Sequence, residues 1–232
     1  MELLYTVMGV IVVVVILMRV FASSIYDYVI IHMTARWYEI LILELLPNSS
    51  VLDVGIGTGS ALCANKTTIL QKKLSFLGID YNGTYVTSAQ KNLVSAGLNK
   101  NCAVMQGSVY DIGKNAALPK GYKCDAVYFS GSFSLMPDPS EALRVCAKFL
   151  NKGGKIYITQ TFQRRAFPGL ALIKPLVKYI TTIDFGALVM ETEVHAMVKG
   201  AGMRIERNEV IKGSVDNMWQ AAYLVVIDPR GT

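Results

Sequence analysis

The stretch VLDVGIGTGS, residues 51–60, decides the fold of this 232-residue chain, because it joins an apolar run to a glycine-rich turn. Residues 51–54 have the composition of a buried strand, and Gly55, Gly57 and Gly59 follow at alternate positions. Glycine accepts backbone conformations that other residues avoid and lets a chain approach a ligand closely. The turn therefore predicts a ligand site, and the surrounding residues indicate its kind.

Strand-like and helix-like segments alternate after this turn. Short apolar strands separated by helices predict a parallel sheet with helices on both faces. Two final strand-like runs, 202–210 and 219–228, are joined by a polar loop without a helix, so they are expected to pair antiparallel. The expected fold class is α/β, with a doubly wound, mostly parallel sheet and an antiparallel last strand. The other expected strands are 50–55, 74–80, 102–107, 124–130 and 154–162, and the expected helices are 60–73, 82–97 and 138–150.

The N-terminus carries an uncharged run from Leu3 to Met18, and its apolar character continues to Ala22. About 20 residues cross the apolar core of a bilayer, so residues 1–23 are predicted to form a transmembrane helix that anchors the chain. A cleaved signal peptide is an alternative, but the run is preceded by Glu2 and by no Lys or Arg. A buried core helix is a second alternative, which the unbroken Val-rich surface disfavours.

The charges beside this run predict its orientation. Arg19 and Arg36 follow it, so the positive-inside rule places the C-terminal part in the cytosol or an equivalent compartment such as the mitochondrial matrix. The four cysteines show no CxxC pair and no metal-ligand spacing, which indicates reduced thiols and no metal site. We therefore expect a single-pass membrane protein with a docking helix at 24–47 and one domain at 48–232.

The net charge is +6, and its distribution is uneven. No acidic residue occurs between Glu141 and Asp184. Residues 161–186, which overlap the end of this stretch, mix apolar and basic residues, as in a lid lying on a membrane surface, although an ordinary helix pair would have a similar composition. Nucleic acid could attract such a stretch, but anionic lipid is favoured beside a membrane anchor. The basic residues are Arg144, Lys148, Lys152, Lys155, Arg164, Arg165, Lys174 and Lys178.

Asp53 distinguishes between the cofactors that use such a turn. A dinucleotide fingerprint has an apolar strand here and Gly or Ala where this chain has Ser60. A carboxylate suits a cationic ligand better than a pyrophosphate. VLDVGIGTG resembles the first motif of the class I S-adenosylmethionine-dependent methyltransferases, hydrophobic-hydrophobic-D/E-x-G-x-G-x-G. LGIDYN, which ends the second strand at Asp80, and the segment 124–160 resemble later parts of the family's pattern.

The resemblance covers roughly residues 34–228 and is nearest to the branch that methylates quinones, sterols and other small lipophilic acceptors. It implies a seven-stranded Rossmann-like sheet and S-adenosyl-L-methionine as the cofactor. Asp80 would accept hydrogen bonds from the ribose, and Ser108 stands where the family often has an acidic residue for the adenine. The implied cofactor-binding residues are Asp53, Gly55, Gly57, Gly59, Asp80, Tyr81, Ser108, Val109 and Ser130.

Candidate catalytic residues are few. Ser130 and Ser132 follow the fourth strand, where the family brings cofactor and acceptor together, although either could simply hydrogen-bond within its loop. His195 is the remaining candidate base, and a lone histidine on a helix can also be structural. The expected function is a membrane-anchored methyltransferase for a small lipophilic acceptor. The alternative is a catalytically degenerate accessory subunit of a membrane protein complex, for which Ser108 is the motivating residue.

Overall fold

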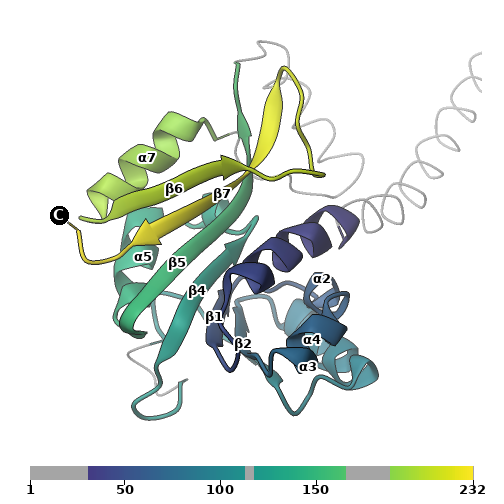
Figure 1. The fold of residues 1–232 in the computed structure, drawn as a ribbon. Coiled ribbons are helices and arrows are strands. Elements are labelled where there is room, and N and C mark those ends of the chain that lie inside the picture. Colours follow the sequence, from purple (N-terminus) through teal and green to yellow (C-terminus); the bar gives the residue numbers. More distant parts are fainter. Residues whose placement is uncertain (1–30, 113–117, 166–188, 232) are drawn as a thin grey trace, which may run out of the picture.

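A computed structural model describes residues 31–112, 118–165 and 189–231. They form a seven-stranded sheet with the order β3-β2-β1-β4-β5-β7-β6 (Figure 1). Neighbouring strands from β3 to β5 are parallel, while β7 is antiparallel to both β5 and β6. The expected mostly parallel sheet with a reversed last strand is confirmed. The strands are β1 (Ser50–Val54), β2 (Ser75–Asp80), β3 (Cys102–Gln106), β4 (Cys124–Ser130), β5 (Leu150–Gln163), β6 (Arg204–Val210) and β7 (Gln220–Asp228).

Helices cover both faces of the sheet (Figure 1). One face packs on α5 (Pro139–Ala147) and α7 (Glu191–Gly200). The other packs on residues 31–44, which are helical, and on α2 (Ser60–Cys63), α3 (Lys66–Gln71) and α4 (Gly83–Ala96). Successive residues of a strand point to opposite faces, so Tyr128 belongs to one core and Phe129 to the other. The doubly wound architecture is confirmed.

Residues 60–73 were expected to form one helix, but the structure divides them into α2 and α3. Asn65 lies between the two with φ −98° and ψ 15°, outside the helical region. Its side-chain amide donates to the carbonyl of Ala61 at 3.1 Å and to that of Ala35 at 2.9 Å. Asn competes for helix hydrogen bonds in this way, and here its second bond also holds the preceding helix. The two other predicted helices keep their expected starts, because Asn82 and Asp138 cap α4 and α5.

The helix at 31–44 docks on the sheet through side chains that are almost completely buried. Lys72 donates to the carbonyls of Ile42 and Leu45 at 2.8 Å each, so an ammonium group satisfies carbonyls that the helix end leaves unpaired. Glu44 forms an ion pair with Arg207 on β6. The buried side chains are Trp37, Tyr38, Leu41, Ile42 and Leu45.

Two expected segments lie wholly or mostly outside the described residues. They are the anchor at 1–23 and the basic insert at 161–186, of which only 161–165 are described. Within the parts of the chain that the structure describes, no helix is both long and apolar enough to span a bilayer. Arg164, at the start of the insert, forms an ion pair with Asp216 at 2.7 Å.

Candidate functional site

The glycine turn connects β1 to α2 at the carboxyl edge of the parallel strands. Gly55, Gly57 and Gly59 have φ angles of 77°, 61° and 67°, a left-handed conformation that glycine adopts at little cost. The three glycines nevertheless have different surroundings. A Cβ atom added to Gly55 would lie 2.5 Å from the Cβ of Ser132, and one added to Gly59 would lie 3.4 Å from that of Ala89. A Cβ on Gly57 would meet no atom within 4 Å.

Packing within the protein therefore explains Gly55, and the left-handed backbone explains Gly59. Gly55 lets the end of β1 lie close to the loop after β4, whereas a Cβ on Gly59 would make only ordinary contact with Ala89 on α4. Neither contact requires a ligand. Of the three glycines of the turn, Gly57 alone combines a left-handed backbone with open space where a Cβ would lie, so a side chain there would enter space that a ligand can occupy.

Asp53 lies immediately before this turn and has no exposed surface. Its Oδ2 accepts a 2.6 Å hydrogen bond from the hydroxyl of Tyr38. Its Oδ1 is buried and has no hydrogen-bond partner among the described residues. Burial raises the pKa of Asp53 to about 7; the bond from Tyr38 opposes this shift, and the nearby carboxyl of Asp80 adds to it. An unsatisfied buried carboxylate oxygen is costly, so this atom indicates a cationic or hydrogen-donating ligand.

Asp80 ends β2 and supports the turn directly. Its Oδ2 accepts a 2.9 Å hydrogen bond from the backbone N–H of Gly57, and its Oδ1 accepts one of the same length from Asn82. The backbone N–H of Gly55 donates to the carbonyl of Ile79 at 2.7 Å. Hydrogen bonds therefore connect the glycine turn after β1 to the end of β2. The two predicted carboxylates, Asp53 and Asp80, both lie beside this turn.

The end of β3 supplies the predicted adenine-binding residues. Gly107 donates its N–H to the carbonyl of Asp80 at 2.9 Å, which places Ser108 and Val109 next to the β2 edge. Ser108 Oγ accepts a hydrogen bond from the N–H of Tyr110 at 3.3 Å, while Val109 is buried in the core. Tyr81 is 81% exposed, so its ring lies on the surface beside this edge. The structure brings these residues to the strand ends that also carry Asp53 and Asp80.

Ser130 and Ser132, both predicted for the acceptor side, have different environments. Ser132 is buried, and its hydroxyl donates to the carbonyl of Val54 while its Cβ packs on Gly55. This contact matches the loop-bonding alternative for Ser132. Ser130 Oγ is buried and has no hydrogen-bond partner among the described residues. Ser130 is therefore the better candidate of the two for contacting a ligand.

The structure does not bring His195 to the glycine turn. His195 lies on α7 with a half-exposed side chain, 3.2 Å from the amide of Asn208 on β6. In the sheet order, β5 and β7 separate β6 from β4. This position agrees with the structural alternative for the histidine.

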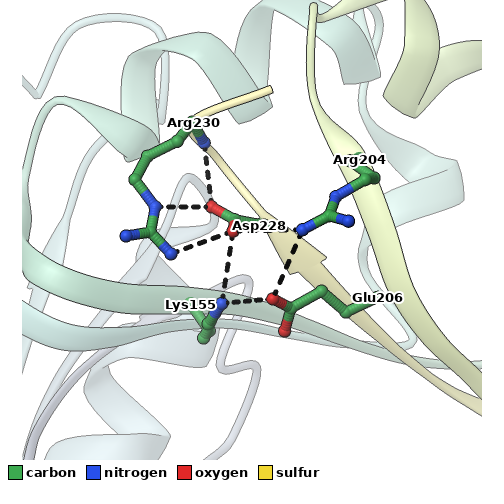
Figure 2. A network of polar contacts seen from close by, with 5 residues as sticks. All are labelled: Lys155, Arg204, Glu206, Asp228 and Arg230. Carbon is green, nitrogen blue, oxygen red and sulfur yellow. Dashed lines mark hydrogen bonds and ion pairs between the residues drawn. The ribbon is translucent and has the colours of Figure 1, made fainter. Parts of the chain in front are cut away.

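His195 borders a surface groove of about 490 Å³ between α7 and the start of β6. Beside it, Lys155, Arg204 and Arg230 surround Asp228 and Glu206 (Figure 2). The hydrogen bonds and charge of Arg230 and the charge of Lys155 lower the pKa of Asp228. These contacts join β5, β6 and β7, so we infer that the network stabilises the pairing of the strands at this edge of the sheet. The groove lies apart from the glycine turn and from the orphan oxygen of Asp53.

Tyr38 and Gln160 lie near the glycine turn and the carboxyl ends of the parallel strands, but the sequence did not predict them as site residues. Gln160 is 7% exposed and exchanges hydrogen bonds with Ser134 after β4, which places an amide at the ends of β4 and β5. Tyr38 reaches Asp53 from the helix at 31–44. The sequence marks Tyr38 only as one of several apolar positions on that helix, so no local pattern identifies its partner.

Known proteins that are similar to this chain include methyltransferases. A family model described as a methyltransferase domain matches residues 45–209. A phosphatidylethanolamine N-methyltransferase from Cereibacter sphaeroides is 25% identical over 137 residues, covering 58% of this chain. A ubiquinone biosynthesis O-methyltransferase from Xanthomonas axonopodis pv. citri (strain 306) is 26% identical over 167 residues, covering 67% of this chain. The matches span only 62% and 63% of those two relatives.

The fold is also found among solved structures. A SAM-dependent methyltransferase from Geobacter sulfurreducens, determined with S-adenosyl-L-homocysteine, superimposes with a TM-score of 0.57 at 15% identity. The superposition covers 84% of this chain and 90% of that structure. The seven-stranded sheet described above is therefore the fold of these enzymes.

Proposed function

This chain belongs to the methyltransferase domain family, and we propose that it transfers a methyl group from S-adenosylmethionine to a small lipophilic acceptor at a membrane. The observation that carries the proposal is the unpartnered oxygen of Asp53. Asp53 lies four residues before Gly57, the glycine of the turn with open space where a Cβ would lie, and it is close enough to the carboxyl of Asp80 for that charge to raise its pKa. This site combines two carboxylates with a stretch of backbone that has no side chain. Such a site suits a ligand that contains both a cationic amino acid and a nucleoside.

The residues present fit this cofactor. Asp53 would face the ammonium group of the cofactor, and Asp80 would accept hydrogen bonds from its ribose hydroxyls. Gly57, which has no side chain, would let the cofactor lie close to the backbone of the turn. Val109 and Ser108 would lie at the adenine. The bound cofactor supplies an electrophilic methyl carbon on a sulfonium, so the protein has to align the acceptor and exclude water.

The described segments on the expected acceptor side offer no strong base. The segments Ser130–Leu135 and Gln160–Arg165 contain no Asp, Glu or His. They contribute the free hydroxyl of Ser130 and the amide of Gln160, which can orient an acceptor but are weak bases. This composition favours an acceptor that is already nucleophilic, or one whose proton passes to solvent.

The membrane part of the proposal rests on the sequence and on the relatives. The apolar run from Leu3 to Ala22 has the length of a bilayer span. The two relatives are named for a phospholipid and for ubiquinone biosynthesis, both of which concern lipophilic molecules. We accordingly propose a single-pass protein whose domain lies on the cytosolic or matrix side, with the acceptor arriving from the bilayer.

The test is calorimetric titration of the full-length chain in detergent with S-adenosylhomocysteine. The proposal expects binding that Asp53→Asn weakens, followed by methyl transfer to quinol or phospholipid acceptors in the presence of S-adenosylmethionine. Binding without transfer to any lipophilic acceptor would favour the degenerate accessory subunit. Absence of binding would remove both the cofactor and the enzyme assignment.

A further inference from the structure

Tyr38 and Asp53 form a buried pair that joins the N-terminal helix to the glycine turn. The Tyr38 side chain comes from the helix at 31–44, is 2% exposed and donates to Asp53 Oδ2 at 2.6 Å. The other oxygen of the same carboxylate has no partner among the described residues. One oxygen is therefore held by the protein, and the other is left for a ligand.

Tyr128, the aromatic residue beside Tyr38, does not hydrogen-bond to Asp53. Tyr128 on β4 contacts Tyr38 edge to face, with ring centroids 5.0 Å apart. Its hydroxyl lies 2.7 Å from Thr159 Oγ1 on β5 and forms a hydrogen bond there. Two buried tyrosines thus lie side by side, and Tyr38 is the one whose hydroxyl is directed at Asp53.

Trp37, which precedes Tyr38 on the helix at 31–44, contacts two further segments near the site. Trp37 donates its indole N–H to Ser214 Oγ at 2.9 Å, in the loop between β6 and β7. Its ring lies 3.4 Å from the position that a Cβ on Gly131 would occupy, in the loop after β4. Residues 37 and 38 therefore connect the helix to loops at the carboxyl edge as well as to Asp53.

We propose that Tyr38 is a positioning residue of the cofactor site, which holds Asp53 through one oxygen, keeps the other available to a cationic group, and so couples docking of the N-terminal helix to cofactor binding. This inference rests on the proposed function for the identity of the ligand. The pairing of Tyr38 with Asp53 itself does not depend on that identity.

The charge state of Asp53 gives the inference a specific signature. A hydrogen bond donated to a carboxylate favours its ionised form, so Tyr38 lowers the pKa of Asp53 against the effect of burial. Loss of the hydroxyl should raise that pKa further, and the ionised form that binds a cation should appear only at higher pH. The other titratable groups near the pair are Asp80 on β2, Cys102 on β3, Tyr128 on β4 and Cys63 on α2.

The experiment titrates the full-length chain with S-adenosylhomocysteine between pH 6 and pH 9. Tyr38→Phe should weaken binding on the order of tenfold at pH 7, because it removes a hydrogen bond to a charged group. The loss should shrink as the pH rises, since Asp53 then ionises in the variant also. Tyr128→Phe is the matched control: it removes a buried hydroxyl from the same aromatic pair and should leave the pH dependence unchanged.

Equal affinity and an unchanged pH midpoint in Tyr38→Phe would overturn the inference and leave the proposed function intact. Equal weakening by both tyrosine variants without a pH shift would also overturn it, because that result describes helix packing alone. If the unmodified chain does not bind at any pH, the proposed function fails. The pH dependence of unfolding without ligand then still tests the pair, since Tyr38→Phe should move the Asp53 midpoint upward.

Discussion

The place where a Cβ of residue 55 would lie is 2.5 Å from the Cβ of Ser132. Packing against the loop after β4 is thus enough to require glycine at the first position of the turn. The third glycine, Gly59, would meet Ala89 on α4 only at an ordinary contact distance, so its left-handed φ of 67° is what favours glycine there. A glycine-rich motif that suggests three contacts with a cofactor therefore contains one position that packing within the protein already requires.

Gly55→Ala should destabilise the protein by roughly 2–5 kcal/mol, because a left-handed conformation costs about 1–2 kcal/mol and overpacking adds about 1–3 kcal/mol. Gly57→Ala is the control. It bears the same backbone strain at φ 61° but meets no atom, so it should cost only about 1–2 kcal/mol. Urea unfolding of both variants measures the difference; equal destabilisation would contradict the assignment of Gly55 to packing.

Gly57→Ala should weaken binding of S-adenosylhomocysteine by roughly 1–3 kcal/mol, because its new methyl group would occupy space that the ligand approaches. Calorimetry on the folded variant measures this change. A small effect on stability with a large effect on binding would separate Gly57 from its two neighbours. Unchanged affinity would show that the turn does not face the ligand.

Asp80→Ala should weaken the same ligand by about 1.5–3 kcal/mol, because two ribose hydroxyls would lose a charged acceptor. The N–H groups of Gly57 and Asn82 would also lose their acceptor, so the turn itself should loosen. Asp111→Ala controls for net charge, since Asp111 is an exposed acid after β3. Equal effects from Asp80→Ala and Asp111→Ala would remove Asp80 from the ribose site.

Asp53 should make stability fall as the pH rises. Its folded pKa is about 7, against 3.8 for an ordinary aspartate, so between these values the folded protein keeps a proton that the unfolded chain releases. The stabilisation is complete below about pH 4 and is lost as the pH rises to about 7. The unfolding free energy of Asp53→Asn, relative to the unmodified protein, should therefore increase by on the order of 2–4 kcal/mol from pH 4.5 to pH 8.

Asp125→Asn is the matched control for this measurement. Burial acts to raise the pKa of Asp125, but hydrogen bonds from Ser50 and Asn151 outweigh it and the pKa is lowered. Its effect on stability therefore changes only at more acidic pH, and the same comparison should be flat from pH 4.5 to pH 8. A flat result for Asp53→Asn as well would show that Asp53 is ionised throughout.

The basic insert should bind anionic vesicles in a salt-dependent way. Each basic residue near an anionic surface contributes about 1 kcal/mol, and screening reduces this as the Debye length approaches about 8 Å. Arg164 is already paired with Asp216, so Arg165, Lys174 and Lys178 should contribute most. Their replacement by Gln in a chain lacking residues 1–23 should abolish co-sedimentation with anionic vesicles at low salt, while Arg164→Gln alone should change it little. Indifference of the parent chain to such vesicles would contradict the membrane-lid hypothesis.

The fold was predictable because its signals are local. Apolar runs, capping residues such as Asn82 and Asp138, and the glycines of the turn each act within a few residues of themselves. The single helix expected at 60–73 was wrong, because Asn65 also bonds to Ala35, a contact between distant parts of the chain. The sequence predicted an antiparallel last pair, but the insertion of β7 between β5 and β6 is visible only in the sheet.

The sequence by itself determined the α/β architecture, the carboxylates Asp53 and Asp80, and their place at the strand ends, because parallel strands carry their carboxyl ends to one edge. Only the tertiary structure decided what each residue touches. It placed Ser132 against Gly55, placed His195 beside β6, and brought Tyr38 to within 2.6 Å of Asp53. These contacts depend on how separate helices and loops pack on the sheet, and packing between distant segments leaves no periodic pattern in the chain.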